Sequence, residues 1–96
     1  MDNRLTAIFT GSDEVAAGVM IEANDQNVKV PEELAVIGFD DQPLAEMLHP
    51  KLTTIKQPIS LMGEKAVEGL VTMMQENSSN PENIELPVEL IERKST

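Results

Sequence analysis

Apolar residues in the first part of the chain form short unbroken runs and one helically spaced stripe. Residues 5–10 are a run without strict alternation, which predicts a strand buried on both faces, as in parallel sheets. Ser12 can cap a helix that extends to about Asn24, and its apolar positions are Val15, Ala16, Val19, Met20 and Ala23. A second apolar run, residues 34–39, follows the helix. Strand, helix and strand in this order predict a βαβ unit with a right-handed crossover.

The second part of the chain changes pattern twice. Residues 42–51 predict a loop or one short helical turn, and residues 52–55 have the β-branched character of a strand. Pro58 suits the first turn of a second helix, whose apolar stripe contains Ile59, Met62, Ala66, Leu70 and Met73, widened by Val67, Val71 and Met74. Residues 77–81 predict a flexible connector. Alternation at Ile84, Leu86, Val88 and Leu90 predicts a half-exposed strand, and Pro87 indicates that this strand lies at an edge.

These elements predict an α/β fold with a mostly parallel sheet and helices on both faces. The chain supplies only two substantial helices, so the layers are expected to be incomplete. We expect residues 1–96 to form a single domain, because domains usually contain roughly 50 to 200 residues.

Charge and composition exclude several classes of function. The net charge of −10 argues against binding of this chain to a phosphate backbone, since that binding depends on Lys and Arg. Cysteine is absent, so neither disulfides nor thiolate metal sites can form. No run approaches the roughly 20 apolar residues that span a bilayer, and we expect no membrane partner.

Polar residues follow each of the three expected strands of the sheet. They are Ser12 and Asp13, then Asp40 and Asp41, and then Gln57. Ligands of open α/β sheets bind beyond the carboxyl ends of the strands, and these side chains are suited to hydroxyl groups. The alternative is that the first pair only caps a helix and the second only forms a turn, because such residues are favoured there in any case.

Neither a metal site nor a catalytic constellation is predicted. The aspartates and the lone His49 have no ligand-like spacing. Residues 11–14 lack the second glycine of a nucleophile elbow. We therefore expect no cofactor and no enzymatic activity.

Several segments resemble the LacI/GalR family of transcriptional regulators over essentially the whole chain. The motifs are residues 6–9 with 12–14, VPEELAVIGFDD at 30–41, PKLTTIKQP at 50–58, and the tail at 86–93. The resemblance implies a type I periplasmic-binding-protein-like core, in which two α/β lobes close on a small effector. A helix-turn-helix head precedes this core in the chain. This chain would be most of the second lobe, a C-terminal fragment of the effector-binding and dimerisation domain without the DNA-binding head.

The resemblance also implies roles for individual residues. The first aspartate of the GFDD motif, here Asp40, binds effector hydroxyls in the family. Ser12 replaces the usual asparagine before Asp13, and Gln57 lines the cleft in some members. Surfaces that some members use for dimerisation contain four candidates, Ala17, Met20, Met47 and Leu48, for which ordinary core packing is the alternative.

The sequence leaves three classes of function open. The first is the ligand-sensing part of a cytoplasmic repressor that binds a sugar or sugar phosphate, forms a homodimer or higher oligomer, and reaches operator DNA only through the absent head. The second is a lobe of a periplasmic sugar-binding protein, and the third is a small α/β enzyme. The segment at residues 49–58 favours the regulator, whereas the enzyme lacks a catalytic constellation.

Overall fold

A computed structural model describes residues 6–77 and 83–96, which divide into two compact units. The first unit contains the chain up to Lys56 together with Glu89–Thr96, and the second unit is Gln57–Val88. The chain therefore leaves the first unit once and returns to it, so that the first unit is discontinuous in sequence.

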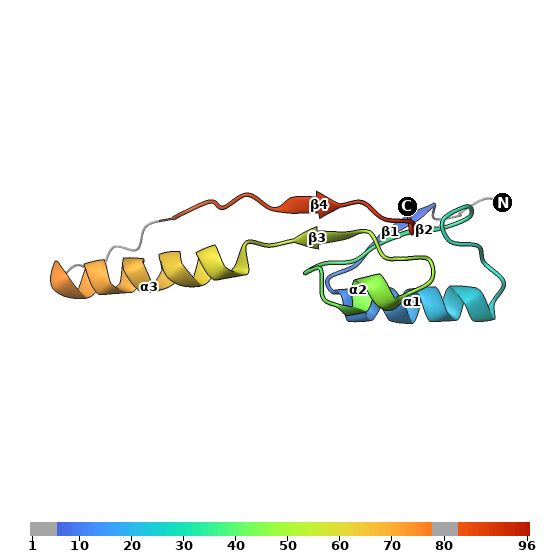
Figure 1. Cartoon of the computed structure of the whole chain (residues 1–96), viewed down its shortest axis with the longest axis horizontal. Coiled ribbons are helices and arrows are strands. Elements are labelled where there is room, and N and C mark those ends of the chain that lie inside the picture. The colour runs from blue at the N-terminus through green and yellow to red at the C-terminus, as the bar shows by residue number, and fades with distance from the viewer. Residues whose placement is uncertain (1–5, 78–82) are drawn as a thin grey trace. The chain divides into compact units, whose positions relative to one another are not determined.

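The first unit is built on a parallel strand pair joined by a helix (Figure 1). Strand β1 (Ala7–Phe9) pairs in parallel with β2 (Ala35–Ile37), and helix α1 (Asp13–Asp25) connects them. The βαβ connection predicted from the sequence is confirmed. The regular strands are shorter than the apolar runs, and Leu5 lies outside the described residues.

Helix α1 begins where the sequence predicts it. The side chain of Ser12 accepts a hydrogen bond from the backbone N–H of Val15 at 3.1 Å. This cap satisfies one of the N–H groups that a helix start leaves without partners. Asp13 and Glu14 lie in the first turn, where the partial positive charge of the helix favours acidic residues.

A small aliphatic core joins α1 to the strands and to the short helix α2 (Leu44–Met47). Its buried members are Ala16, Met20, Val36, Ala45 and Leu52. In Figure 1 both helices lie on the same side of β1 and β2. The described part of the first unit thus covers one face of the strand pair, and Phe9 is 62% exposed.

The third and fourth strands form an antiparallel pair. Strand β3 (Thr54–Lys56) pairs with β4 (Glu89–Ile91), and a parallel bridge from Ile37 to Thr53 joins β2 to this region. The strand expected from Ile84 onward is regular only from Glu89. The reason is that β3 supplies only three partner residues, and a strand needs a partner for its backbone groups.

The last residues of the chain are held firmly in the first unit. Ser95 is fully buried, and its hydroxyl donates to the Val36 carbonyl at 2.6 Å while accepting from the Thr53 N–H at 2.8 Å. The Ser95 carbonyl in turn accepts from the Val36 N–H at 2.9 Å. Residues 93–96 therefore complete the polar contacts of β2 and of the segment before β3.

The second unit contains helix α3 (Ile59–Gln75), which begins directly after Pro58 as predicted. No residue of α3 is buried, and its apolar positions Ile59, Val67, Leu70 and Met74 are exposed. The connector expected at residues 77–81 falls largely outside the described residues. None of the described helices is both long and apolar enough to cross a membrane.

Gly38 is required by a close approach of three segments. A Cβ atom on Gly38 would lie 2.7 Å from Cδ2 of Leu52 and would also clash with Oδ1 of Asp13. Both neighbours are fully buried, so neither can move without disturbing its own packing. By contrast, nothing lies within 4 Å of a Cβ added to Gly18 on α1.

We predict opposite effects for two glycine-to-alanine substitutions. Gly38→Ala should lower the free energy of unfolding by about 1–3 kcal/mol, because it overpacks a buried site. Gly18→Ala should raise it by up to about 1 kcal/mol, since alanine is the better helix former. Urea denaturation of the two variants measures both effects, and equal transition midpoints would contradict the packing described for Gly38.

Candidate functional site

The structure brings Ser12, Asp13, Asp40 and Asp41 together at the carboxyl ends of β1 and β2. The backbone N–H of Asp13 donates to the Phe39 carbonyl at 3.1 Å, which joins the start of α1 to the loop after β2. This is the edge at which open α/β sheets bind ligands. The grouping of these four residues, which the sequence predicted, is present in the first unit.

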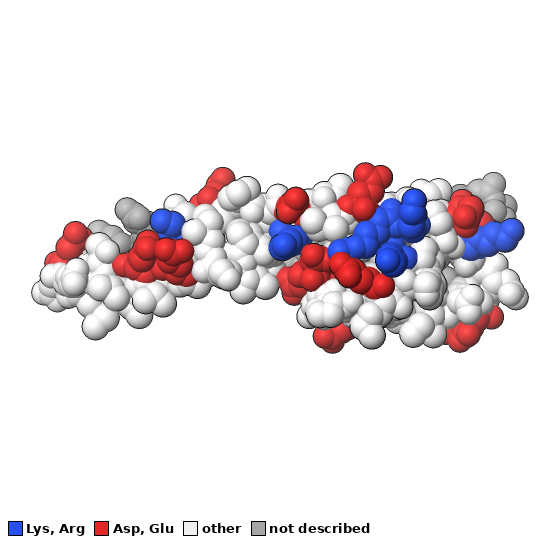
Figure 2. Space-filling model, viewed as in Figure 1, with Lys and Arg blue, Asp and Glu red and all other residues white. Residues whose placement is uncertain are grey.

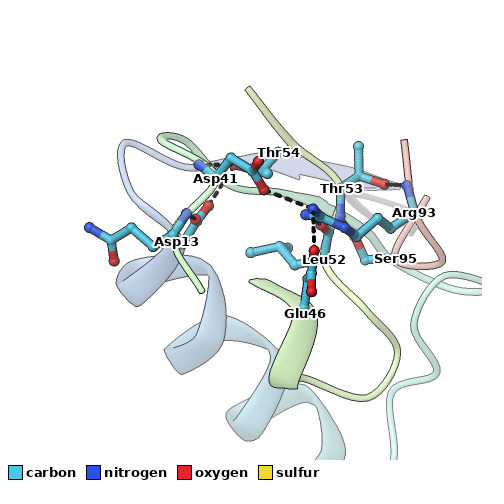
Figure 3. Close-up of polar contacts among 9 residues, drawn as sticks. Asp13, Asp41, Glu46, Leu52, Thr53, Thr54, Arg93 and Ser95 are labelled. Carbon is cyan, nitrogen blue, oxygen red and sulfur yellow. Dashed lines mark hydrogen bonds and ion pairs between the residues drawn. The ribbon is translucent and has the colours of Figure 1, made fainter. Parts of the chain in front are cut away.

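Asp13 is the anchor of this edge (Figure 3). Its side chain is fully buried, with Oδ1 accepting from the Thr54 hydroxyl and Oδ2 from the Gln42 N–H, both at 2.6 Å. Both carboxylate oxygens are therefore bound to protein donors from two other segments. Asp13 thus holds Thr54 and the loop at Gln42 in place at this edge.

Asp40 and Asp41 form a turn with unusual backbone geometry. Their φ angles are 101° and 51°, in the left-handed region that non-glycine residues seldom adopt and that aspartate tolerates better than most. Two bonds hold the turn: the Asp40 N–H donates to the Ile55 carbonyl at 2.7 Å, and the Asp41 N–H donates to the Thr54 hydroxyl at 3.2 Å. Asp40 is half-buried, so its side chain lies on a turn whose backbone is fixed.

Arg93 contacts the same turn from the end of β4 (Figure 3). One guanidinium nitrogen lies 2.8 Å from Asp41 Oδ1, and the other donates to the Leu52 carbonyl at 2.9 Å. No local sequence pattern assigns a site role to Arg93. It lies 52 residues from Asp41, and an arginine after an alternating strand carries no sign of such a distant partner.

The remaining predicted site residues lie in different places. Ser12 uses its hydroxyl oxygen to cap α1, although a hydroxyl can donate at the same time. Gln57 is the first residue of the second unit, where its carbonyl accepts from the Ile59 N–H at 2.9 Å. Its role in an effector site stays a prediction.

The four candidate dimer residues differ in exposure. Ala17 and Met20 are buried in the first unit, and Leu48 packs against the core. Met47, at the end of α2, is 73% exposed. Met47 is thus the most exposed member of this set.

Charge and donor geometry limit the chemistry of the chain. On the face shown in Figure 2, acidic and basic side chains of the first unit lie next to one another. This mixture does not form the broad basic patch that nucleic-acid phosphates require. Among the described residues, no group of three or more His, Asp or Glu side chains is placed to hold a metal ion.

Comparison with known proteins gives matches along the entire chain. The model of the periplasmic binding protein-like domain matches residues 1–96. The NTD biosynthesis operon regulator NtdR of Bacillus subtilis (strain 168) is 44% identical over 97 residues, which cover 100% of this chain and 30% of NtdR. The chain thus spans about a third of the length of this relative.

Solved structures of regulators share the fold. The transcriptional regulator CelR in complex with cellobiose has a TM-score of 0.87 and 30% identity, covering 96% of this chain and 28% of CelR. The Lac repressor dimer bound to operator and the anti-inducer ONPF has a TM-score of 0.82 and 32% identity, covering 95% of this chain and 32% of the repressor. These relatives are regulators and not enzymes, which agrees with the expectation from the sequence and favours the regulator over the periplasmic alternative.

The α/β, periplasmic-binding-protein-like fold class predicted from the sequence is confirmed by the family model and by these structures. Because the model matches all 96 residues, the chain belongs to the periplasmic binding protein-like domain family, and its relatives place it with the LacI-family transcriptional regulators.

Proposed function

We propose that the chain is part of the effector-binding domain of a LacI-family repressor and that Asp40 binds hydroxyl groups of a sugar-like effector. The observation that carries this proposal is the fixed turn after β2, where the Asp40 N–H is bound to the Ile55 carbonyl at 2.7 Å. A carboxylate held at a strand's carboxyl end can accept two hydroxyl donors. The cellobiose in the CelR complex supports a carbohydrate as the class of effector.

Ser12 and Gln57 are secondary members of the proposed effector site. Ser12 precedes the buried Asp13 and retains a hydroxyl proton that can be donated to a ligand. Gln57 follows β3 and carries an amide with both donor and acceptor groups. Asp13 contributes through its bonds to Thr54 and Gln42.

The complete protein is proposed to act as a cytoplasmic homodimer that binds operator DNA through a segment outside this chain. The Lac repressor relative is a dimer bound to its operator, which supports this arrangement. Within this chain, we propose that Met47 contacts the partner subunit, with Leu48, Met20 and Ala17 packed close to that surface. The exposure of Met47 supports its assignment.

Replacement of Asp40 tests the effector site. In the full-length protein, titration calorimetry with cellobiose, glucose and sucrose should show binding of at least one sugar. Asp40→Ala should weaken that binding about ten- to a hundredfold, because a hydrogen bond to a charged group contributes roughly 1.5–3 kcal/mol. Asp25→Ala, an exposed change at the end of α1, should leave the affinity unchanged. Equal affinities of the wild type and Asp40→Ala would remove Asp40 from the site.

A second experiment separates the roles of this chain and of the rest of the protein. The 96-residue chain should bind duplex DNA from the promoter of its own gene no better than duplex DNA of random sequence. The reason is that its net charge of −10 repels phosphates. The full-length protein should bind the promoter duplex specifically. Fluorescence anisotropy at low salt measures both affinities, and specific micromolar binding by the isolated chain would contradict the assignment of DNA binding to another segment.

A further inference from the structure

We infer that Arg93 is a positioning residue of the effector site and that its ion pair with Asp41 holds the turn that presents Asp40. The inference rests on the proposed function, which assigns Asp40 to the effector. Arg93 belongs to the segment after β4. It ends the tail motif at 86–93, but neither the resemblance nor the proposed site gives it a role.

Arg93 is held in place by contacts other than the one with the turn. Its backbone N–H donates to the Thr53 hydroxyl at 2.8 Å, and its guanidinium donates to the Leu52 carbonyl at 2.9 Å. The guanidinium is planar, so fixing one of its nitrogens also fixes the direction of the other. The nitrogen 2.8 Å from Asp41 Oδ1 is thus aimed by contacts that do not depend on Asp41.

The turn needs such a contact because its backbone is in an unfavourable region. The left-handed φ angles of Asp40 and Asp41 persist only where the surroundings impose them. The backbone bonds of these two residues restrain their N–H groups. The ion pair adds a restraint on the Asp41 side chain, so its loss would allow the turn to relax and would move Asp40.

Solvent screening distinguishes Asp41 from a second carboxylate near Arg93. The side chains of Arg93 and Asp41 are only 14% and 18% exposed, so water screens this pair weakly. Glu46 lies 3.5 Å from the same guanidinium nitrogen but is 70% exposed, and exposed pairs of this kind contribute little. Glu46→Gln is therefore a matched control, because it removes a carboxylate from Arg93 without touching the turn.

The test measures the affinity of full-length variants for cellobiose, glucose and sucrose by calorimetry, with thermal unfolding recorded in parallel. Asp41→Asn keeps the residue's tolerance for the left-handed region and the Arg93 contacts with Leu52 and Thr53, so it isolates the ion pair. We expect Asp41→Asn and Arg93→Met each to weaken effector binding by about tenfold, as for the loss of one charged hydrogen bond. Glu46→Gln should bind as the wild type does.

Two further variants distinguish positioning from general stability. Arg93→Lys should recover part of the affinity, because lysine restores the charge but not the two-pronged geometry. The double variant Arg93→Met with Asp41→Asn should bind the effector no more weakly than the weaker of the two single variants, since both changes remove the same ion pair. A structural role alone would lower the unfolding temperature of Arg93→Met and Asp41→Asn and leave their effector affinities at the wild-type value.

The outcomes separate this inference from the proposed function. If Asp40→Ala weakens binding while Asp41→Asn and Arg93→Met do not, the positioning role of Arg93 is overturned and the proposed function stands. Additive losses in the double variant would also overturn it. If Asp40→Ala leaves binding unchanged, or if the wild type binds none of the three sugars, the proposed effector site fails and this inference fails with it.

Discussion

The buried carboxylate of Asp13 is the interaction on which the first unit depends. Burying a charged group is costly unless hydrogen bonds replace its hydration, and here the Thr54 hydroxyl and the Gln42 N–H do so. These donors lie 41 and 29 residues away in sequence, so one side chain joins the start of α1, the loop after β2 and the start of β3. Gly38 makes the arrangement possible because no larger residue fits beside that carboxylate.

Three aspartates at one edge of the strands have different surroundings and therefore different proposed roles. Asp13 is surrounded by protein donors, and Asp41 is paired with Arg93 on a half-buried turn. Asp40 lies on the same turn as Asp41 and is assigned to the effector in the proposed function. The division of roles follows from environment and not from residue type, since the same carboxylate serves as a structural anchor, a restraint on the turn and a proposed ligand-binding group.

Patterns of neighbouring residues predicted the helices and strands of this fold, but they did not predict contacts between residues far apart in sequence. Ser12 as a cap, the βαβ connection and the start of α3 after Pro58 are properties of neighbouring residues, and the structure has them. The extent of β4 was predicted less well, because strand length depends on the partner strand. The positions of the strand ends placed Asp40 at this edge of the sheet, and the structure has it there. The burial of Asp13 and the contacts of Arg93 arise from pairings tens of residues apart, which no pattern of adjacent positions encodes. The single-domain expectation, the dimer residues and the assignment of Asp40 stay predictions.

The discontinuity of the first unit has a consequence for the order of folding during synthesis. A ribosome makes the residues up to Lys56 before Gln57–Val88, and makes Glu89–Thr96 only after both. Until the last segment emerges, β3 has no β4 beside it, and the Val36 carbonyl and the Thr53 N–H lack the Ser95 hydroxyl. At 5–20 residues per second this interval is on the order of seconds, far longer than the microseconds in which helices form. During that interval the strand edge of the nascent first unit stays open, and an unpaired edge of this kind can pair with another chain.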